Sequence, residues 1–121
     1  CIITESAKKM IDLKKLKNNI NGKVYYDYSE KNNLMLHIKL TRDSNLIVVC
    51  PATENIIAKY ANGYANDLAT NSLIASNKQI IFFPAMNTEM WNNPINQDNV
   101  KKLKNFGVEF FGPEHGILAC G

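Results

Sequence analysis

The sequence predicts a doubly wound α/β fold, in which helices connect the strands of a parallel sheet. Two continuous apolar runs rich in β-branched residues, at 46–50 and 79–83, are typical of strands that are buried on both faces. Segments with helical periodicity lie between and after these runs, so that strands and helices alternate along the chain. A length of 121 residues without an internal repeat or linker indicates one domain, over residues 1–121.

The N-terminal part is expected to contribute a strand, a helix and a second strand. The opening residues 1–4 have the pattern of a strand end. A helical spacing of apolar residues follows from Ser6 to Lys17 and stops at Asn21-Gly22. Residues 24–28 alternate weakly between polar and apolar, which predicts a short strand.

The rest of the chain continues the alternation, with end residues that suit each element. Gly63 and Gly107 are placed as left-handed helix stops, and Asp67 as a helix N-cap. The expected elements are helices at 53–62, 68–75 and 96–106 and a strand at 108–111.

Charge and hydropathy exclude several classes of partner. The net charge of +3 comes from lysines, since Arg42 is the only arginine. The lysine runs at 14–17 and 101–104 fit solvated helix faces better than a nucleic-acid surface, which would interleave arginine and aromatic residues. No apolar stretch approaches the roughly 18 residues needed to cross a membrane, and no signal peptide is visible.

The cysteines indicate a reducing compartment, so we expect a cytoplasmic protein. Cys1, Cys50 and Cys120 show no C-x-x-C spacing. Cys50 lies inside an apolar strand and is expected to be a buried small hydrophobe. His37 and His115 lie far from any close pair of cysteines, so no metal site is expected.

Both long apolar runs end in the same pair of residues, Pro51-Ala52 and Pro84-Ala85. In parallel α/β folds, ligands bind beyond the carboxyl ends of the strands. Each proline is expected to stop its strand, and each small alanine allows the backbone to approach a flat ligand. One such pair would be read as a strand-to-helix turn, but two of them, followed by Asn55 and Asn87, favour a ligand site.

Several stretches then resemble the flavin-containing cysteine decarboxylases in their order and spacing. The segment around His37 matches the part of that family that carries its active-site histidine. The other matching stretches are Pro51-Ala52-Thr53-Glu54-Asn55-Ile56, Asn62-Gly63-Tyr64-Ala65-Asn66-Asp67-Leu68, Pro84-Ala85-Met86-Asn87-Thr88-Glu89-Met90-Trp91 and Ala119-Cys120-Gly121.

The resemblance covers essentially the whole chain and is closest to the branch that acts on phosphopantothenoylcysteine in coenzyme A biosynthesis. It implies a Rossmann-like or flavodoxin-like three-layer flavoprotein fold, FMN as cofactor, and a homo-oligomer that is a trimer or a multiple of trimers. By the same resemblance, a further strand, turn and helix of the domain are expected before Cys1, and a substrate clamp is expected to continue beyond Gly121. Glu54 departs from the family, which has alanine there.

The expected chemistry requires a cofactor, because no side chain can accept the electrons that loss of CO2 from a cysteine-type carboxylate releases. The resemblance implies that FMN oxidises the substrate thiol toward a thioaldehyde. CO2 then leaves, the enethiolate is protonated, and reduced flavin returns the electrons to give 4′-phosphopantetheine. The alternatives are a non-catalytic FMN-binding subunit of the same fold and a peptidyl-cysteine decarboxylase.

Two residues are candidates for catalysis. An imidazole, with an unperturbed pKa of roughly 6.5, suits His37 as a base for the thiol or as a partner for the carboxylate, and the alternative is a structural histidine. A thiol, with an ordinary pKa of about 8.5, suits Cys120 as the proton donor to the enethiolate. Unpaired cysteines are more often small buried hydrophobes.

Asn87 is the candidate that binds the substrate carboxylate, together with Ala119 and Gly121 of the clamp. A neutral amide orients the acid without the full charge that would stabilise it against loss of CO2. The alternative for Asn87 is an N-cap of the short helical turn that follows. The candidates for cofactor binding are Thr4, Ser6, Thr53, Glu54, Asn55, Ile56, Ala85, Met86 and Met90.

Some of these cofactor candidates have competing structural roles. Ser6 could be a helix N-cap, and Thr4 could simply end a strand. Met86, Met90 and Trp91 have the composition of a packed core and could also contact a neighbouring subunit.

Overall fold

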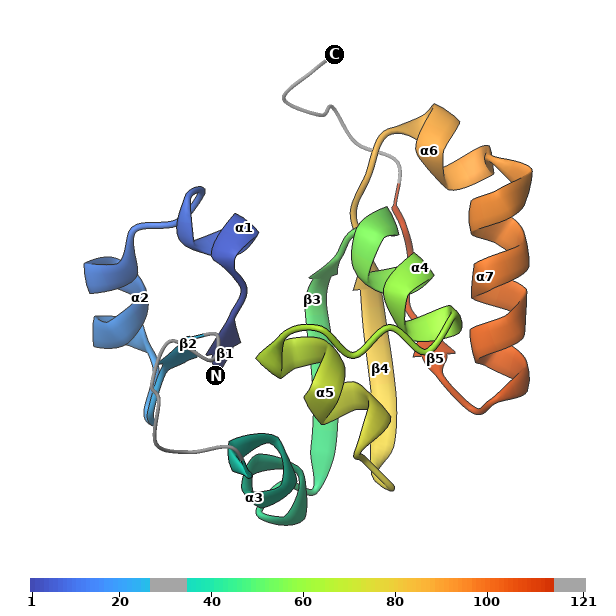
Figure 1. The fold of residues 1–121 in the computed structure, drawn as a ribbon. Coiled ribbons are helices and arrows are strands. Elements are labelled where there is room, and N and C mark those ends of the chain that lie inside the picture. Colours follow the sequence, from blue (N-terminus) through green and yellow to red (C-terminus); the bar gives the residue numbers. More distant parts are fainter. Residues whose placement is uncertain (27–34, 115–121) are drawn as a thin grey trace.

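The chain forms two parallel sheets connected by helices (Figure 1). The structure is a computed structural model that describes residues 1–26 and 35–114. One sheet pairs β1 (Ile2–Ile3) with β2 (Tyr25–Tyr26). The other contains β3 (Leu46–Ala52), β4 (Gln79–Pro84) and β5 (Glu109–Phe110), in that order. All pairings between the described strands are parallel, which confirms the predicted fold class.

Most of the helices overlap segments whose periodicity predicts a helix. The three predicted long helices are confirmed to within two residues at each end, and Gly63 and Gly107 have φ values of 72° and 92°, as left-handed stops require. The helices are α1 (Glu5–Lys8), α2 (Leu13–Asn19), α3 (Leu36–Arg42), α4 (Glu54–Ala61), α5 (Leu68–Ile74), α6 (Thr88–Asn92) and α7 (Pro94–Asn105). None in the described part is long and apolar enough to cross a membrane.

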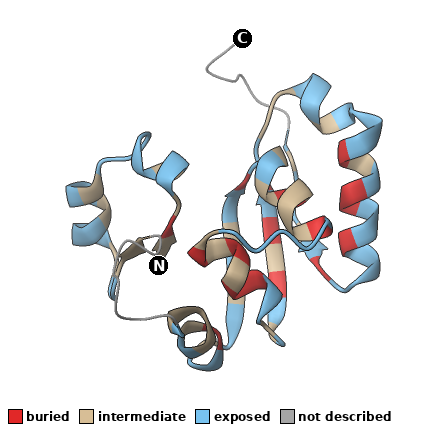
Figure 2. Cartoon of the chain, viewed as in Figure 1, coloured by how far each residue is buried: buried red, intermediate tan, exposed pale blue. Residues whose placement is uncertain are grey.

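The hydrophobic core lies between one face of the larger sheet and the helices α4, α5 and α7 (Figure 2). Because side chains alternate along a strand, every second residue of β3 and β4 faces away from this core. Among these residues, Leu46, Val48 and Phe83 are exposed. The core residues are Ala52, Ile57, Ala61, Leu73, Ile80, Phe82, Val100, Leu103 and Val108.

The expectation that Cys50 is buried is wrong. Cys50 is exposed. It lies two residues after Val48 on β3, and therefore on the same face of the strand, which the described helices leave open. An apolar run alone does not show which face of a strand is covered.

The expected single helix from Ser6 to Lys17 is also wrong, because the chain forms α1 and α2 instead. The side chain of Asp12 accepts hydrogen bonds from the backbone N of Lys14 at 2.9 Å and of Lys15 at 3.1 Å. Such a cap begins a new helix and interrupts the first one. The apolar spacing is shared by both helices and does not show the break.

The larger sheet also extends slightly further than predicted. β3 continues through Pro51 to Ala52, and β4 includes Pro84. The pairing survives because the backbone N of Ala85 donates to the carbonyl O of Ala52 at 3.1 Å. Pro51 therefore lies within β3 and does not stop it, whereas β4 ends at Pro84, as expected.

The N-terminus of α5 depends on Asp67, as predicted. Its carboxylate accepts hydrogen bonds from the backbone N of Thr70 at 2.7 Å and from Nζ of Lys59 at 3.1 Å. Burial would raise the pKa of Asp67, but the hydrogen bonds from Thr70 and Lys59 and the Lys59 charge outweigh it and hold the pKa below its ordinary value. The ionised form therefore stabilises the fold at neutral pH, and this contribution is lost as the pH falls through the folded-state pKa.

We expect Asp67→Asn to lower the free energy of unfolding at pH 7 by about 1 kcal/mol, because asparagine keeps the cap but loses the ion pair. The difference from wild type should narrow as the pH falls below the ordinary aspartate pKa of about 3.9. Urea unfolding of both proteins across this pH range measures the difference in their free energies of unfolding. Asp43→Asn is the matched control, since the Lys39–Asp43 pair is 68% and 64% exposed and should contribute little. If the difference in the free energy of unfolding between wild type and Asp67→Asn does not change with pH, the ionised carboxylate of Asp67 does not have the stabilising role assigned to it.

Candidate functional site

The two Pro-Ala segments lie side by side at the carboxyl ends of neighbouring strands. β3 and β4 are adjacent, with Ala52 in register with Pro84. The hydrogen bond from Ala85 to Ala52 joins the two segments directly. Ala52 is fully buried, whereas Ala85 is exposed, so the backbone at Ala85 is accessible to a ligand. The structure thus brings together the two segments that the sequence singles out.

The first turn of α4 places further candidate residues at this edge. Thr53 is the N-cap residue, but its side chain makes no capping hydrogen bond, and both Thr53 and Asn55 are exposed. Ile56 is half-buried and packs against the core. Glu54 is half-buried in the first turn, where the helix dipole favours a negative charge. The hydroxyl of Thr53 and the amide of Asn55 are therefore the groups of this turn that can meet an external ligand.

Asn87 has the structural role that its position predicts as the alternative to a ligand role. Its Oδ1 accepts a hydrogen bond from the backbone N of Met90 at 2.8 Å and so caps α6. Among the described residues, no acceptor takes a hydrogen bond from its Nδ2. Asn87 is half-buried and lies just beyond β4. Its Nδ2 can therefore donate to an anion while its Oδ1 caps the helix.

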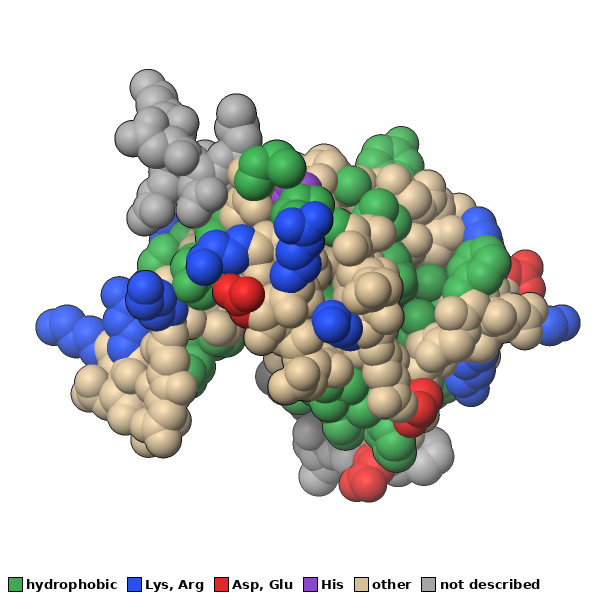
Figure 3. All heavy atoms as spheres, turned by 90° about the horizontal axis from the view of Figure 1, so that it is seen from below, with side chains coloured by type: hydrophobic (Ala, Val, Ile, Leu, Met, Phe, Trp, Pro, Cys, Tyr) green, Lys and Arg blue, Asp and Glu red, His purple; other side chains and the backbone are tan. Residues whose placement is uncertain are grey.

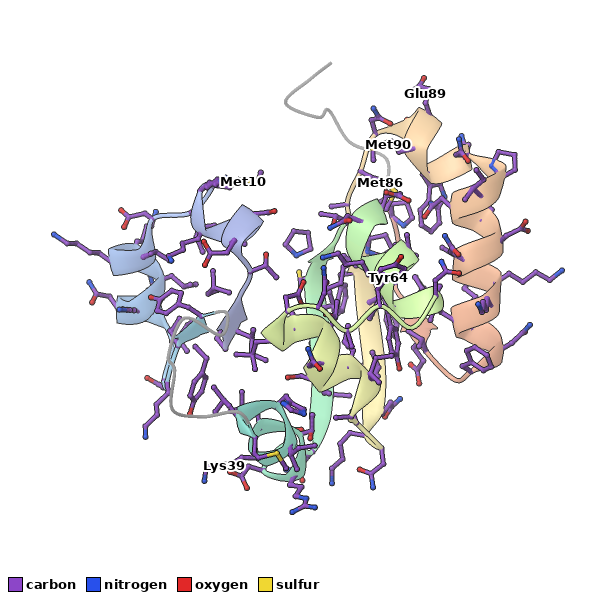
Figure 4. All side chains as sticks on the ribbon, in the orientation of Figure 1. Met10, Lys39, Tyr64, Met86, Glu89 and Met90 are labelled. Atoms are coloured by element: carbon purple, nitrogen blue, oxygen red, sulfur yellow. The ribbon has the colours of Figure 1, made fainter. Side chains whose placement is uncertain are left out.

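The two methionines on either side of Asn87 differ in exposure. Met86 is half-buried and packs against the core together with Trp91. Met90 is 43% exposed. In Figure 4 both methionines lie with Glu89 at the end of the molecule where α4 begins. Met86 is thus mainly a packing residue, and Met90 offers an apolar surface.

Thr4 also follows a strand, β1, and is the N-cap of α1. Its Oγ1 accepts a hydrogen bond from the backbone N of Ala7 at 3.3 Å. Ser6 lies inside α1 and is exposed, so the idea that Ser6 caps this helix is wrong. In Figure 1 the start of α1 is at the same end of the molecule as the start of α4.

His37 lies at the other end of the molecule, in the first turn of α3. Figure 4 shows Lys39 of the same helix far from Met86 and Met90. β3 has seven residues and separates its two ends by about 20 Å, at about 3.3 Å per residue. Figure 3 views the end that carries α3 and shows its lysine and arginine side chains dispersed between apolar and polar ones. Within one chain, His37 and Asn87 therefore belong to different ends of the sheet.

The remaining candidate residues, Ala119, Cys120 and Gly121, lie outside the described residues, as does His115. Their expected roles stay predictions.

Sequence reasoning missed two amide side chains near the site, Asn96 and Gln97. Both donate to the carbonyl O of Trp91, at 3.1 and 2.6 Å. The sequence contains a pattern that could have identified Asn96. It lies four residues before Val100 and is therefore on the buried face of α7. A buried asparagine on an apolar helix face needs a hydrogen-bonding reason.

Comparison with known proteins agrees with this architecture. The family model described as Flavoprotein matches residues 1–121. The chain is 38% identical over 120 residues to the coenzyme A biosynthesis bifunctional protein CoaBC of Borreliella burgdorferi. The matched region covers 98% of this chain and 31% of that protein. The chain thus spans about a third of the bifunctional relatives that it matches first.

Several solved structures share the fold. The FMN-dependent cysteine decarboxylase SpaF matches with a TM-score of 0.86 and 27% identity, over 95% of this chain and 66% of that one. A PPC decarboxylase variant complexed with pantothenoylaminoethenethiol matches with a TM-score of 0.84 and 29% identity, over 99% of this chain and 69% of that one. With the family model matching its whole length, the chain belongs to the Flavoprotein family.

Proposed function

We propose that the protein catalyses the FMN-dependent decarboxylation of 4′-phosphopantothenoylcysteine to 4′-phosphopantetheine, a step of coenzyme A biosynthesis in the cytoplasm. The likeness of nearly the whole chain to a PPC decarboxylase that holds a pantothenoyl thiol carries this proposal. Its similarity to CoaBC proteins points the same way. Residues 1–121 would act as one flavoprotein domain.

The residues at the carboxyl ends of β3 and β4 fit a flavin. Ala85 is exposed and has no large side chain to block a flat ring, while Thr53 and Asn55 present a hydroxyl and an amide beside it. These groups, with Thr4, Ser6, Glu54, Ile56, Met86 and Met90, are the proposed cofactor-binding residues. When bound, FMN supplies the reversible two-electron chemistry that the reaction needs.

Asn87 is proposed to hold the carboxylate of the substrate through Nδ2. Since its Oδ1 is fixed by the α6 cap, the amide plane is set before substrate binds. A neutral donor orients the carboxylate without stabilising it as strongly as an arginine would, so loss of CO2 is less opposed. Ala119 and Gly121 are proposed to complete this subsite.

His37 is proposed to reach the site from a neighbouring copy of the chain. It lies at the end of the sheet opposite to Asn87, so an arrangement in which both act on one substrate requires two copies. This supports a homo-oligomer, and the resemblance to trimeric family members favours a trimer or a multiple of trimers. His37 would take the proton of the substrate thiol, and Cys120 would protonate the enethiolate after CO2 has left.

The test is CO2 release from 4′-phosphopantothenoylcysteine by the purified protein, with the flavin identified by its absorption and mass. We expect a yellow protein that turns over this substrate and is inactive on peptides that end in cysteine. Cys120→Ser should release CO2 but accumulate the unreduced enethiol product, because a hydroxyl is a weaker acid than a thiol. Activity on the peptides alone would replace the proposal with a peptidyl-cysteine decarboxylase, and bound FMN without CO2 release would indicate a non-catalytic subunit.

A further inference from the structure

We propose that Asn96 is a positioning residue, which holds residues 86–91 against α7 and thereby fixes the place of Asn87. The catalytic consequence of this inference rests on the proposed function, in which Asn87 binds the substrate carboxylate. Its geometric basis rests on the contacts of Asn96 alone.

Asn96 fixes both ends of the segment that contains Asn87. It is 2% exposed on the inner face of α7. Its Nδ2 donates to the carbonyl O of Trp91 at 3.1 Å and to Sδ of Met86 at 3.6 Å. One amide group therefore bridges the residue that precedes Asn87 and the last turn of α6.

Asn87 is connected to this bridge by two hydrogen bonds within the segment. Its carbonyl O accepts from the backbone N of Trp91 at 3.0 Å, and its Oδ1 accepts from the backbone N of Met90 at 2.8 Å. Displacing Trp91 would thus displace both the main chain and the side chain of Asn87. The position of the carboxylate-binding amide therefore depends on Asn96.

The buried amide is not explained by packing alone. Oδ1 of Asn96 is buried, and among the described residues no donor reaches it. A buried acceptor without a partner destabilises a fold, so an apolar side chain of similar volume would suit a pure packing role better. The two contacts made by Nδ2 give the asparagine its function.

We expect Asn96→Leu, in the FMN-loaded protein, to leave Tm unchanged or higher while kcat/KM for decarboxylation falls about tenfold. In an Asn87→Ala background, the same substitution should cause no further fall, because the group that it positions is already absent. A second measurement does not need activity. Acrylamide quenching of Trp91, the only tryptophan among the 121 residues, should increase in Asn96→Leu, with Trp91→Phe giving the background.

Gln97→Leu is the matched control, because Gln97 donates to the same carbonyl of Trp91 at 2.6 Å, whereas the hydrogen bond to Sδ of Met86 comes from Asn96. Gln97→Leu should lower kcat/KM less, and increase the acrylamide quenching of Trp91 less, than Asn96→Leu does. Equal losses of kcat/KM with and without Asn87 would show a general structural role and overturn the inference, and so would unchanged quenching. If the wild-type protein releases no CO2, the proposed function fails, and the quenching of Trp91 still decides the positioning role.

Discussion

Replacing His37 by asparagine is expected to lower kcat for decarboxylation by about two to four orders of magnitude, the range typical of losing a general acid or base. Asparagine has a similar size and can donate a hydrogen bond, but it cannot take the proton of the substrate thiol. FMN content should not change, because His37 is not among the proposed cofactor-binding residues, which lie at the carboxyl ends of β3 and β4 and in α1. CO2 release and flavin absorbance per chain measure the two effects separately.

Lys39→Gln is the control for this substitution. Lys39 is on the same short helix, and its side chain forms an exposed ion pair with Asp43 at 3.4 Å, so its loss should leave kcat within about twofold of wild type. If His37→Asn keeps full activity, His37 is a structural residue. If it loses flavin in proportion to activity, His37 acts through cofactor binding and the assigned role is wrong.

The strands that frame the site could be predicted from the sequence because their signals are local. The runs at 46–50 and 79–83 are long, apolar and β-branched, and a parallel sheet places their ends at one edge whatever the rest of the chain does. Asp67, Gly63 and Gly107 mark helix ends through chemistry within one turn. These signals correctly predicted that Ala52 and Ala85 lie close together at the carboxyl ends of neighbouring strands.

Features that depend on contacts distant in sequence could not be predicted in this way. The exposure of Cys50 depends on which helices cover the sheet, and the contacts of Asn96 depend on how α7 packs against residues 86–91. The place of α3 was not predicted either, because no periodic signal distinguishes the two ends of a sheet. The roles of the candidate residues, those of Thr53 and Asn55 included, stay predictions.

Co-expression of two strongly impaired variants, His37→Asn and Asn87→Ala, is expected to restore activity if each site uses His37 of one copy and Asn87 of the next. In a closed ring with random assembly, a site is intact when one copy supplies the histidine and its neighbour the asparagine, which holds for about one quarter of the sites. Each variant alone should have only a small residual activity, which is still measurable. The activity of the mixture should therefore rise from nearly zero to about a quarter of wild type, measured as CO2 release per chain.

The reciprocal mixture gives the control. When the double variant His37→Asn/Asn87→Ala is co-expressed with wild type, a shared site predicts about one quarter of full activity, whereas a site within one chain predicts about one half. No recovery in the first mixture, together with one half in the second, would show that His37 and Asn87 act within the same chain. The roughly 20 Å length of β3 argues against that result. Only a rearrangement that carries α3 to the other end of the sheet could bring the two residues together in one copy.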